Sequence, residues 1–258
     1  MGIWNYILHR WKERGRIDTK MEQIMFLDKN SPDIGLQFRT STEGEEMDLV
    51  REFIDYYIVK FEKTNKKKHL AVFIEPCIES GYPDIVFAKY RPDILEHWND
   101  ARMRLTTNDL KVLSQLIYSR GCSGSYIMRT LKLSERQTIE ALERLLDADM
   151  IVRKNGVWHS RNISYYYSIE QLVSIEAKMG DMKKVIEQSL KNTWFASQSY
   201  VLTGAEKPKE STIMNVKKQG VGLYCKKNKF KKLVEAKKMS LPSSYLSLQF
   251  NEWVASAL

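Results

Sequence analysis

Two short segments place acidic and basic side chains in a pattern that could support metal-dependent hydrolysis. One is Pro83-Asp84, at the start of an apolar run, and the other is Glu176-Ala177-Lys178, at the end of another. Asp84 and Glu176 would give hard carboxylate oxygens to a divalent cation, which would activate water and neutralise charge on a scissile phosphate. Because side chains alternate along a strand, Lys178 is expected on the same face as Glu176.

These residues resemble the motif of the PD-(D/E)XK nuclease superfamily, which includes many restriction and repair endonucleases. The flanking segments predict a helix over 45–61, a strand, the Pro-Asp strand, the E-x-K strand, a helix over 182–195 and a strand over 199–202. The resemblance covers roughly residues 45–90 and 168–225. It implies an α/β fold, namely a restriction-endonuclease-like αβββαβ core with a mixed sheet.

The resemblance also implies roles for individual residues. Asp84, Glu176 and the backbone carbonyl of Ala177 would hold Mg²⁺, or Mn²⁺ in its place, and Lys178 would position or help to deprotonate the attacking water. Gln188 would fill the place of a glutamine that lies near the site in one branch of the superfamily. Further acidic candidates are a glutamate of the first helix and one that precedes the Pro-Asp strand; they are Glu45, Glu46, Glu52 and Glu75.

A structural interpretation of the same residues remains open. Asp84 also suits a turn after proline, and Glu176 with Lys178 suits a solvated pair on an edge strand. Most acids in such positions are solvated, and the sequence does not choose among the glutamates of the first helix.

Residues 102–161 are predicted to form a separate module between the two half-sites. Thr106 or Thr107 suits the N-cap of a first helix, a second helix runs from 125 to 131, and Ser134 suits the cap of a third. Two short strands joined by a turn at Asn155-Gly156 follow. Three helices and a two-stranded wing predict a winged helix-turn-helix inserted between 1–101 and 162–258, the two parts of the nuclease domain.

The inserted module has two candidate roles. As a DNA reader it would place the start of the third helix in the major groove and the wing on the backbone; the residues are Ser134, Arg136, Gln137, Thr138, Arg153, Lys154, His159 and Arg161. As a protein-contact or dimerisation module it would use the acidic side chains of the third helix, which include Glu140, Glu143 and Asp147.

Charge favours a nucleic-acid partner. The chain of 258 residues has a net charge of +9, and residues 178–258 carry all of that excess, with fifteen Lys, no Arg and six acids. Lysines neutralise phosphates as point charges, whereas bidentate base reading is mostly done by arginine, so this part is expected to hold a DNA backbone. Its densest cluster comprises Lys226, Lys227, Lys229, Lys231 and Lys232. A solvated surface without a partner is the alternative.

The remaining features limit the class of protein. Three cysteines without a CxxC pair favour a reduced cytoplasmic setting and argue against structural zinc. With DNA as the partner, the expected location is cytoplasmic and nucleoid-associated. No apolar stretch is long enough to span a membrane. The amphipathic segment 3–15 is expected to dock on the domain or on a second protomer. Residues after Lys238 predict a final helix with Trp253 in the core.

Together these features predict a Mg²⁺-dependent DNA endonuclease, and a homodimer is one arrangement that its resemblance implies. The alternatives are a non-cleaving DNA-binding regulator, or a nuclease subunit of a larger defence or transposition assembly. The presence of all three motif residues, Asp84, Glu176 and Lys178, favours the enzyme.

Overall fold

A seven-stranded mixed sheet forms the centre of the structure, as the α/β expectation required. The computed structural model describes residues 23–31, 35–40, 43–79 and 81–258, so the amphipathic segment 3–15 lies outside the described residues. The strand order is β1-β2-β3-β6-β7-β8-β9. The strands are β1 (Ile24–Leu27), β2 (His69–Ile74), β3 (Ile85–Tyr90), β6 (Ile169–Lys178), β7 (Gln198–Thr203), β8 (Gly222–Lys226) and β9 (Phe230–Val234).

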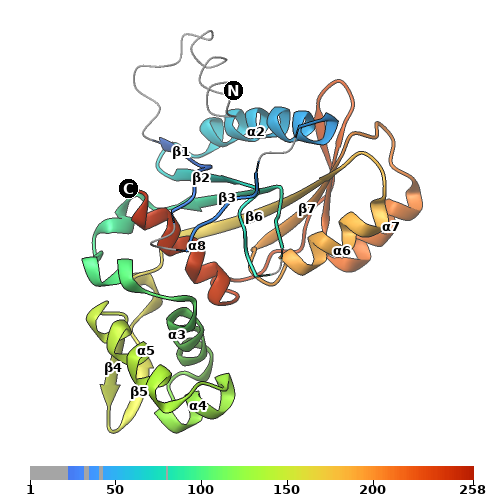
Figure 1. The fold of residues 1–258 in the computed structure, drawn as a ribbon. Coiled ribbons are helices and arrows are strands. Elements are labelled where there is room, and N and C mark those ends of the chain that lie inside the picture. Colours follow the sequence, from blue (N-terminus) through green and yellow to red (C-terminus); the bar gives the residue numbers. More distant parts are fainter. Residues whose placement is uncertain (1–22, 32–34, 41–42, 80) are drawn as a thin grey trace.

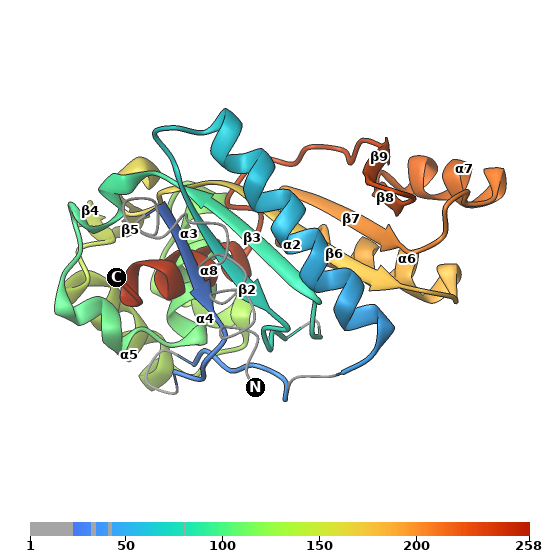
Figure 2. The ribbon, with the colours of Figure 1, turned by 90° about the horizontal axis from the view of Figure 1, so that it is seen from above.

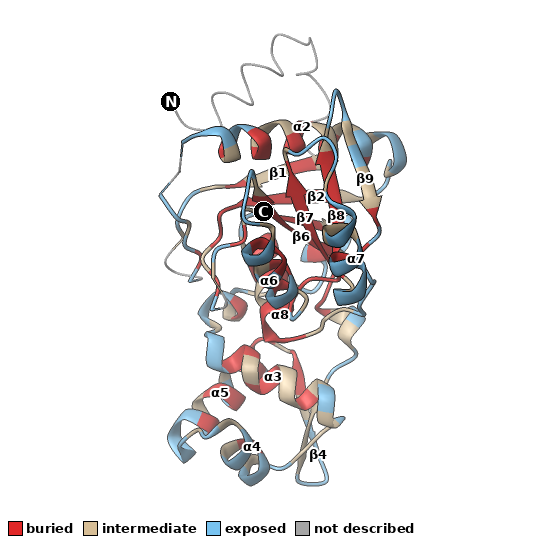
Figure 3. Cartoon of the chain, turned by 90° about the vertical axis from the view of Figure 1, so that its right-hand side faces the viewer, coloured by how far each residue is buried: buried red, intermediate tan, exposed pale blue. Residues whose placement is uncertain are grey.

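Helices cover both faces of this sheet (Figures 1 and 2). Helix α2 (Glu45–Thr64) lies across one face, and its first turn carries Glu45, Glu46 and Asp48, which suit the positive end of a helix dipole. The opposite face is covered by α6 (Met182–Asn192), α7 (Glu210–Gln219) and α8 (Tyr245–Ser256). Figure 3 shows the buried strands between these two layers.

Alternation along the strands decides which layer each side chain meets. On β6, Val173, Ile175 and Ala177 pack in the cluster formed with α2, whereas Leu172 belongs to the cluster formed with α8. The same period assigns Glu176 to the face covered by α6 and α8, because side chains two residues apart share a face.

The strands that carry the two motifs are central and adjacent. β3 pairs antiparallel with both β2 and β6, and β6 pairs in parallel with β7 through the crossover helix α6. A strand with neighbours on both sides has few freely accessible backbone groups, so the expectation of an edge-strand pair for Glu176 and Lys178 does not describe this sheet.

The segment between β3 and β6 forms three helices and a hairpin, with the caps that the sequence predicts. It contains short 3₁₀ turns and a set of regular elements, which are η3 (Pro92–Leu95), η4 (Asp100–Arg104), α3 (Thr107–Ser119), α4 (Gly124–Leu131), α5 (Glu135–Asp147), β4 (Ile151–Lys154), β5 (Val157–Ser160) and η5 (Ile163–Tyr165). Thr106 and Ser134 each form a capping box. Asn155 and Gly156 have φ of 50° and 78°, as a tight hairpin turn requires.

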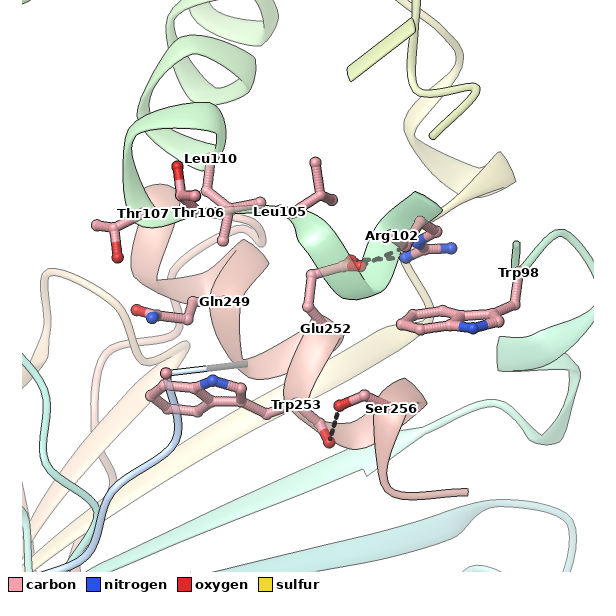
Figure 4. Close-up of a pocket in the computed structure, with 11 residues that line it drawn as sticks. Trp98, Arg102, Leu105, Thr106, Thr107, Leu110, Gln249, Glu252, Trp253 and Ser256 are labelled. Atoms are coloured by element: carbon pink, nitrogen blue, oxygen red, sulfur yellow. Dashed lines mark hydrogen bonds and ion pairs between the residues drawn. The ribbon is translucent and has the colours of Figure 1, made fainter. Parts of the chain in front are cut away.

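A buried ion pair ties this inserted segment to α8. The Arg102 guanidinium donates to both Glu252 carboxylate oxygens, at 2.9 and 2.6 Å, and its side chain is only 1% exposed. Arg102 also donates to the Tyr166 carbonyl oxygen at 3.1 Å, so the chain entering the insert and the chain leaving it meet at one point. Figure 4 shows this pair beside a cavity of about 270 Å³ between α3 and α8.

The end of the chain is more structured than its sequence indicates. The Lys-rich run, which was expected to hold a DNA backbone, includes strand β9, and α7 was not predicted. At the other end, the edge strand β1 was not predicted either. The final helix is confirmed as α8, and Trp253 is buried at 1% exposure. Helical spacing over 182–195 in the sequence groups Leu190 and Trp194 with Val185 and Ile186, which are buried, but Leu190 and Trp194 are exposed by 38% and 53%.

The structure bears on the cysteines and on membrane-spanning segments. Cys77, Cys122 and Cys225 are all free thiols. Among the described residues no helix combines the length and the apolar character that crossing a membrane needs.

Candidate active site

Three acidic residues lie side by side across three neighbouring strands. Ile74 pairs with Ile85, and Ile85 pairs with Ile175. One further step in each register brings Glu75, Asp84 and Glu176 into one row across β2, β3 and β6. The Glu75 N–H donates to the Asp84 carbonyl oxygen at 3.0 Å, which fixes the first of these pairings. Strand pairing therefore makes Asp84 and Glu176 neighbours, although 92 positions separate them in the sequence.

Backbone and side-chain donors hold the two motif carboxylates in place. The Ala177 N–H donates to Asp84 Oδ2 at 2.6 Å, which joins the two motifs directly. The Asn192 side-chain amide donates to Glu176 Oε1 at 2.7 Å, and both side chains are buried. Within the described part of the chain, these bonds leave Asp84 Oδ1 and Glu176 Oε2 for other ligands.

Burial makes both carboxylates hard to ionise. Desolvation raises the pKa of Glu176 to about 8, and the Asp84 charge adds to it, while the Asn192 amide and Lys178 act in the opposite direction. Desolvation also raises the pKa of Asp84 to about 6, opposed by the Ala177 N–H and by Lys178 and reinforced by Glu75 and Glu46. Two acids with raised pKa values in one site are typical of functional carboxylates.

The third motif residue lies close enough to affect both acids. The Lys178 ammonium donates to Glu46 Oε2 at 2.8 Å, at the start of α2. Its charge lowers the pKa of Asp84 and of Glu176. The lysine is about one-third exposed, so its ammonium is partly accessible to solvent.

The donor set at this site suits a hard divalent cation. Asp84 and Glu176 present carboxylate oxygens, and a cation between them would favour the ionised forms that burial now disfavours. Among the described residues, no three His, Cys, Asp or Glu side chains converge on a single point. The acids form a row, so the protein would provide two carboxylates and the Ala177 carbonyl, and Mg²⁺ commonly keeps its remaining ligands as water.

The structure distinguishes among the weaker candidates of the sequence. Glu46 reaches the site because it pairs with Lys178, whereas Glu52 pairs with Lys226 at 2.6 Å. Glu75 is 3% exposed, has a φ of 49° and raises the pKa of Asp84. Gln188 lies on α6, but the residue of this helix that bonds Glu176 is Asn192, four positions later.

Asn192 was not found from the sequence, although one signal was present. It falls at helical spacing from the buried Val185 and Ser189, so it had to face the sheet. A polar residue on the apolar face of a helix needs a buried partner, and the facing strand offers Glu176.

Several residues expected to read DNA bases instead form hydrogen bonds or ion pairs within the inserted segment. Thr138 is only 2% exposed and donates to the Ser134 carbonyl oxygen at 2.9 Å, so it does not belong to an exposed reading surface. Ser134 and Gln137 bond each other in the capping box. Arg136 is 89% exposed and pairs with Glu140 at 2.8 Å.

The predicted wing residues are more accessible. Arg153 and Lys154 are exposed on β4, and the Arg153 guanidinium lies 5.2 Å from the centre of the Trp158 ring. Arg161 pairs with Asp149 at 2.5 Å, and His159 Nδ1 lies 3.1 Å from the Arg120 carbonyl oxygen.

The Lys-rich cluster divides into paired and exposed residues. Lys226 pairs with Glu52, and Lys232 pairs with Glu235 at 2.5 Å. Lys227, Lys229 and Lys231 are exposed, on the β8–β9 hairpin. These three are the members of the cluster best placed to meet phosphates.

Comparison with known proteins gives no family. No protein-family model and no curated protein matches the chain. One solved structure, the crystal structure of protein VC1899 from Vibrio cholerae, is similar at 11% identity over 98% of this chain and 80% of that one, with a TM-score of 0.19. A likeness this low carries no argument about fold or activity.

The raised pKa values predict how the metal-free protein responds to pH. An acid whose pKa is higher in the folded state adds stability that is complete below its unfolded pKa and is lost as pH rises through its folded pKa. In EDTA, the wild type should therefore lose stability between pH 5 and 9 relative to Glu176→Gln, by roughly a few kcal/mol. Urea unfolding of both proteins across this range measures the difference, and parallel profiles would contradict it.

Proposed function

We propose that the protein is a Mg²⁺-dependent endodeoxyribonuclease of the PD-(D/E)XK type, which hydrolyses phosphodiester bonds. The observation that carries this proposal is the direct bond from the Ala177 N–H to Asp84, which joins the Pro-Asp and E-x-K segments. It supports a site in which Asp84, Glu176 and Lys178 act together. The element order α2-β2-β3-β6-α6-β7 agrees with the αβββαβ core that the resemblance implies.

Each residue of the site would have a separate role in hydrolysis. Asp84, Glu176 and the Ala177 carbonyl would hold the cation, while Asn192 keeps the Glu176 carboxylate turned toward it. When bound, the cation supplies Lewis acidity to a phosphate oxygen and makes water a better nucleophile. Lys178 would leave Glu46 to orient the water and to stabilise negative charge on the phosphate in the transition state.

DNA is the substrate that the charge distribution favours. The exposed lysines of the β8–β9 hairpin would hold the backbone, and the basic wing of a winged-helix insert would add contacts. We assign these contacts to the wing and not to α5, because Thr138 is buried and Ser134 and Gln137 bond each other in the capping box. Two copies, each cutting one strand, would produce a double-strand break.

A plasmid-cleavage assay tests the proposal directly. Supercoiled DNA is incubated with the full chain in Mg²⁺, in Mn²⁺ and in EDTA, and nicked and linear products are separated. Cleavage in either metal that stops in EDTA supports the proposal. Cleavage that persists in EDTA contradicts metal dependence, and binding without cleavage in every condition favours the non-cleaving regulator.

The lysine of the motif should matter for rate more than for binding. Replacing Lys178 with alanine removes a donor that stabilises charge in the transition state, and we expect a rate loss of roughly 10². Single-turnover cleavage at saturating protein measures it. Glu46→Gln is the companion variant, because it frees Lys178 without removing it; a loss as large as that of Lys178→Ala would show that the ion pair itself is needed.

The hairpin lysines should control salt dependence. Replacing Lys227, Lys229 and Lys231 with glutamine removes mobile positive charges, so affinity for every DNA sequence should fall alike. The slope of log K against log salt should decrease by roughly 0.9 for each phosphate that the variant no longer neutralises. Lys66→Gln and Lys67→Gln, on the loop after α2, provide the control. An unchanged slope would leave the cluster as a solvated surface.

A further inference from the structure

Two large aromatic side chains are exposed where the inserted segment meets the core. Tyr118, near the end of α3, is 63% exposed, and Trp194, just after α6, is 53% exposed. Tryptophan is highly buried on average, so half of an indole facing solvent is informative. Figure 3 shows α6, α8 and α3 one below another.

A shared neighbour, Ser243, links the two segments that carry the rings. The Tyr118 hydroxyl donates to the Ser243 carbonyl oxygen, and the Ser243 hydroxyl donates to the Trp194 carbonyl oxygen at 2.9 Å. Trp194 also meets the buried Tyr245 ring edge-on, with 5.9 Å between ring centres. We name Tyr118 and Trp194 the aromatic platform. These bonds join the end of α3 to the chain just after α6 through Ser243.

The platform is connected to both catalytic carboxylates. Trp194 lies two residues after Asn192, which holds Glu176. Tyr245, the neighbour of Trp194, forms a hydrogen bond with Glu79 in the segment that leads to Asp84. Trp194 and its neighbour Tyr245 are therefore linked, through Asn192 and Glu79, to the segments that carry Glu176 and Asp84.

Positive charge accompanies the rings. Arg120 and Lys191 are exposed, two residues after Tyr118 and three before Trp194. The Lys111 ammonium lies 4.8 Å from the centre of the Tyr245 ring and 3.2 Å from Glu79. Aromatic faces interleaved with cations are the arrangement that holds single strands, since bases stack on rings and phosphates meet the cations.

We propose that the aromatic platform stacks unpaired bases of the DNA substrate. This inference rests on the proposed nuclease function and narrows its substrate to single-stranded, frayed or branched DNA. Bases in an intact duplex stack on one another and do not offer their faces to a protein ring. Every base has such a face, so the platform gives a preference for strandedness without a preference for sequence.

Binding of labelled DNA in EDTA tests this inference apart from catalysis. A fluorescein-labelled oligothymidine of about 12 nucleotides and a mixed-sequence duplex of about the same length are titrated with wild type and with variants, and anisotropy is recorded. Trp194→Ala and Tyr118→Ala should each weaken single-strand binding by roughly 10-fold and leave duplex binding unchanged. Trp194→Phe should keep most of the affinity.

Two further variants and one further measurement separate the alternatives. Trp194→Leu keeps an apolar side chain without a ring and should behave like Trp194→Ala, whereas Met214→Ala, exposed on α7, should bind as wild type does. Unchanged single-strand affinity, or an equal loss for duplex, would overturn the inference. A changed oligomeric state in sedimentation with unchanged affinity would also overturn it and would assign the rings to a protein contact. Because no metal is present, an inactive enzyme leaves the result intact.

Discussion

Replacing Asp84 with asparagine is expected to abolish DNA cleavage while the protein stays folded. Asparagine keeps the size of the side chain and can still accept the Ala177 N–H, but it removes the charge that would bind the cation. The same reasoning applies to Glu176→Gln. Each variant should lose more than about 10³-fold in rate, because residues that act as one catalytic unit fail together. Single-turnover cleavage in Mg²⁺ measures the loss.

Stability measurements distinguish a variant that no longer binds metal from one that no longer folds. Removing a buried carboxylate with a raised pKa removes the desolvation cost of its charged form, so both variants should be at least as stable as the wild type in EDTA at pH 8. Mg²⁺ should raise the melting temperature of the wild type and not that of the variants. Glu187→Gln, on the exposed side of α6, is the control for both assays. Full activity of Asp84→Asn would remove Asp84 from the site.

Replacing Glu252 with glutamine is expected to destabilise the protein by about 3–5 kcal/mol, the usual cost of breaking a buried ion pair. The variant leaves the Arg102 guanidinium buried at 1% exposure without its counter-charge. Urea unfolding measures the loss. Glu140→Gln breaks the exposed pair with Arg136 and should leave the unfolding midpoint unchanged, because such pairs contribute little.

A double variant keeps this prediction testable if Glu252→Gln does not fold. Replacing both partners with apolar residues of similar volume, Arg102→Met and Glu252→Leu, removes the unpaired charge and should recover most of the stability. A single variant as stable as wild type would mean that water reaches the guanidinium. A double variant less stable than the single one would mean that packing, and not charge, dominates at this position.

Local signals in the sequence were sufficient for most elements and for the two half-sites. The caps at Thr106 and Ser134 and the turn at Asn155-Gly156 depend on side chains within a few residues of the backbone they bond, so they are readable without the fold. Pro83-Asp84 and Glu176-Ala177-Lys178 are likewise local. Their meeting depends on the register of β3 with β6, which only the resemblance implied.

The features that were missed depend on contacts between distant residues. Asn192 could be placed on the inner face of its helix, but its bond to Glu176 requires the position of α6 over β6. Thr138 looked available because its neighbours are polar, yet the packing of α5 buries it. Trp194 looked like a core residue by spacing, but α6 ends at Asn192 and the helical period no longer applies beyond that point.

The order in which the protein folds follows from the way the inserted segment closes on itself. About 90 residues separate Asp84 from Glu176, and residues 102–161 account for most of them. Their helices and hairpin make local contacts, which form quickly, and their two ends are brought together where Arg102 meets the Tyr166 carbonyl. Once the insert has folded, the path between the two carboxylates is effectively about threefold shorter, which lowers the entropy cost of pairing β3 with β6 by about 1 kcal/mol. A slow-folding insert should therefore delay the pairing that brings Asp84 beside Glu176, even though it contributes neither carboxylate.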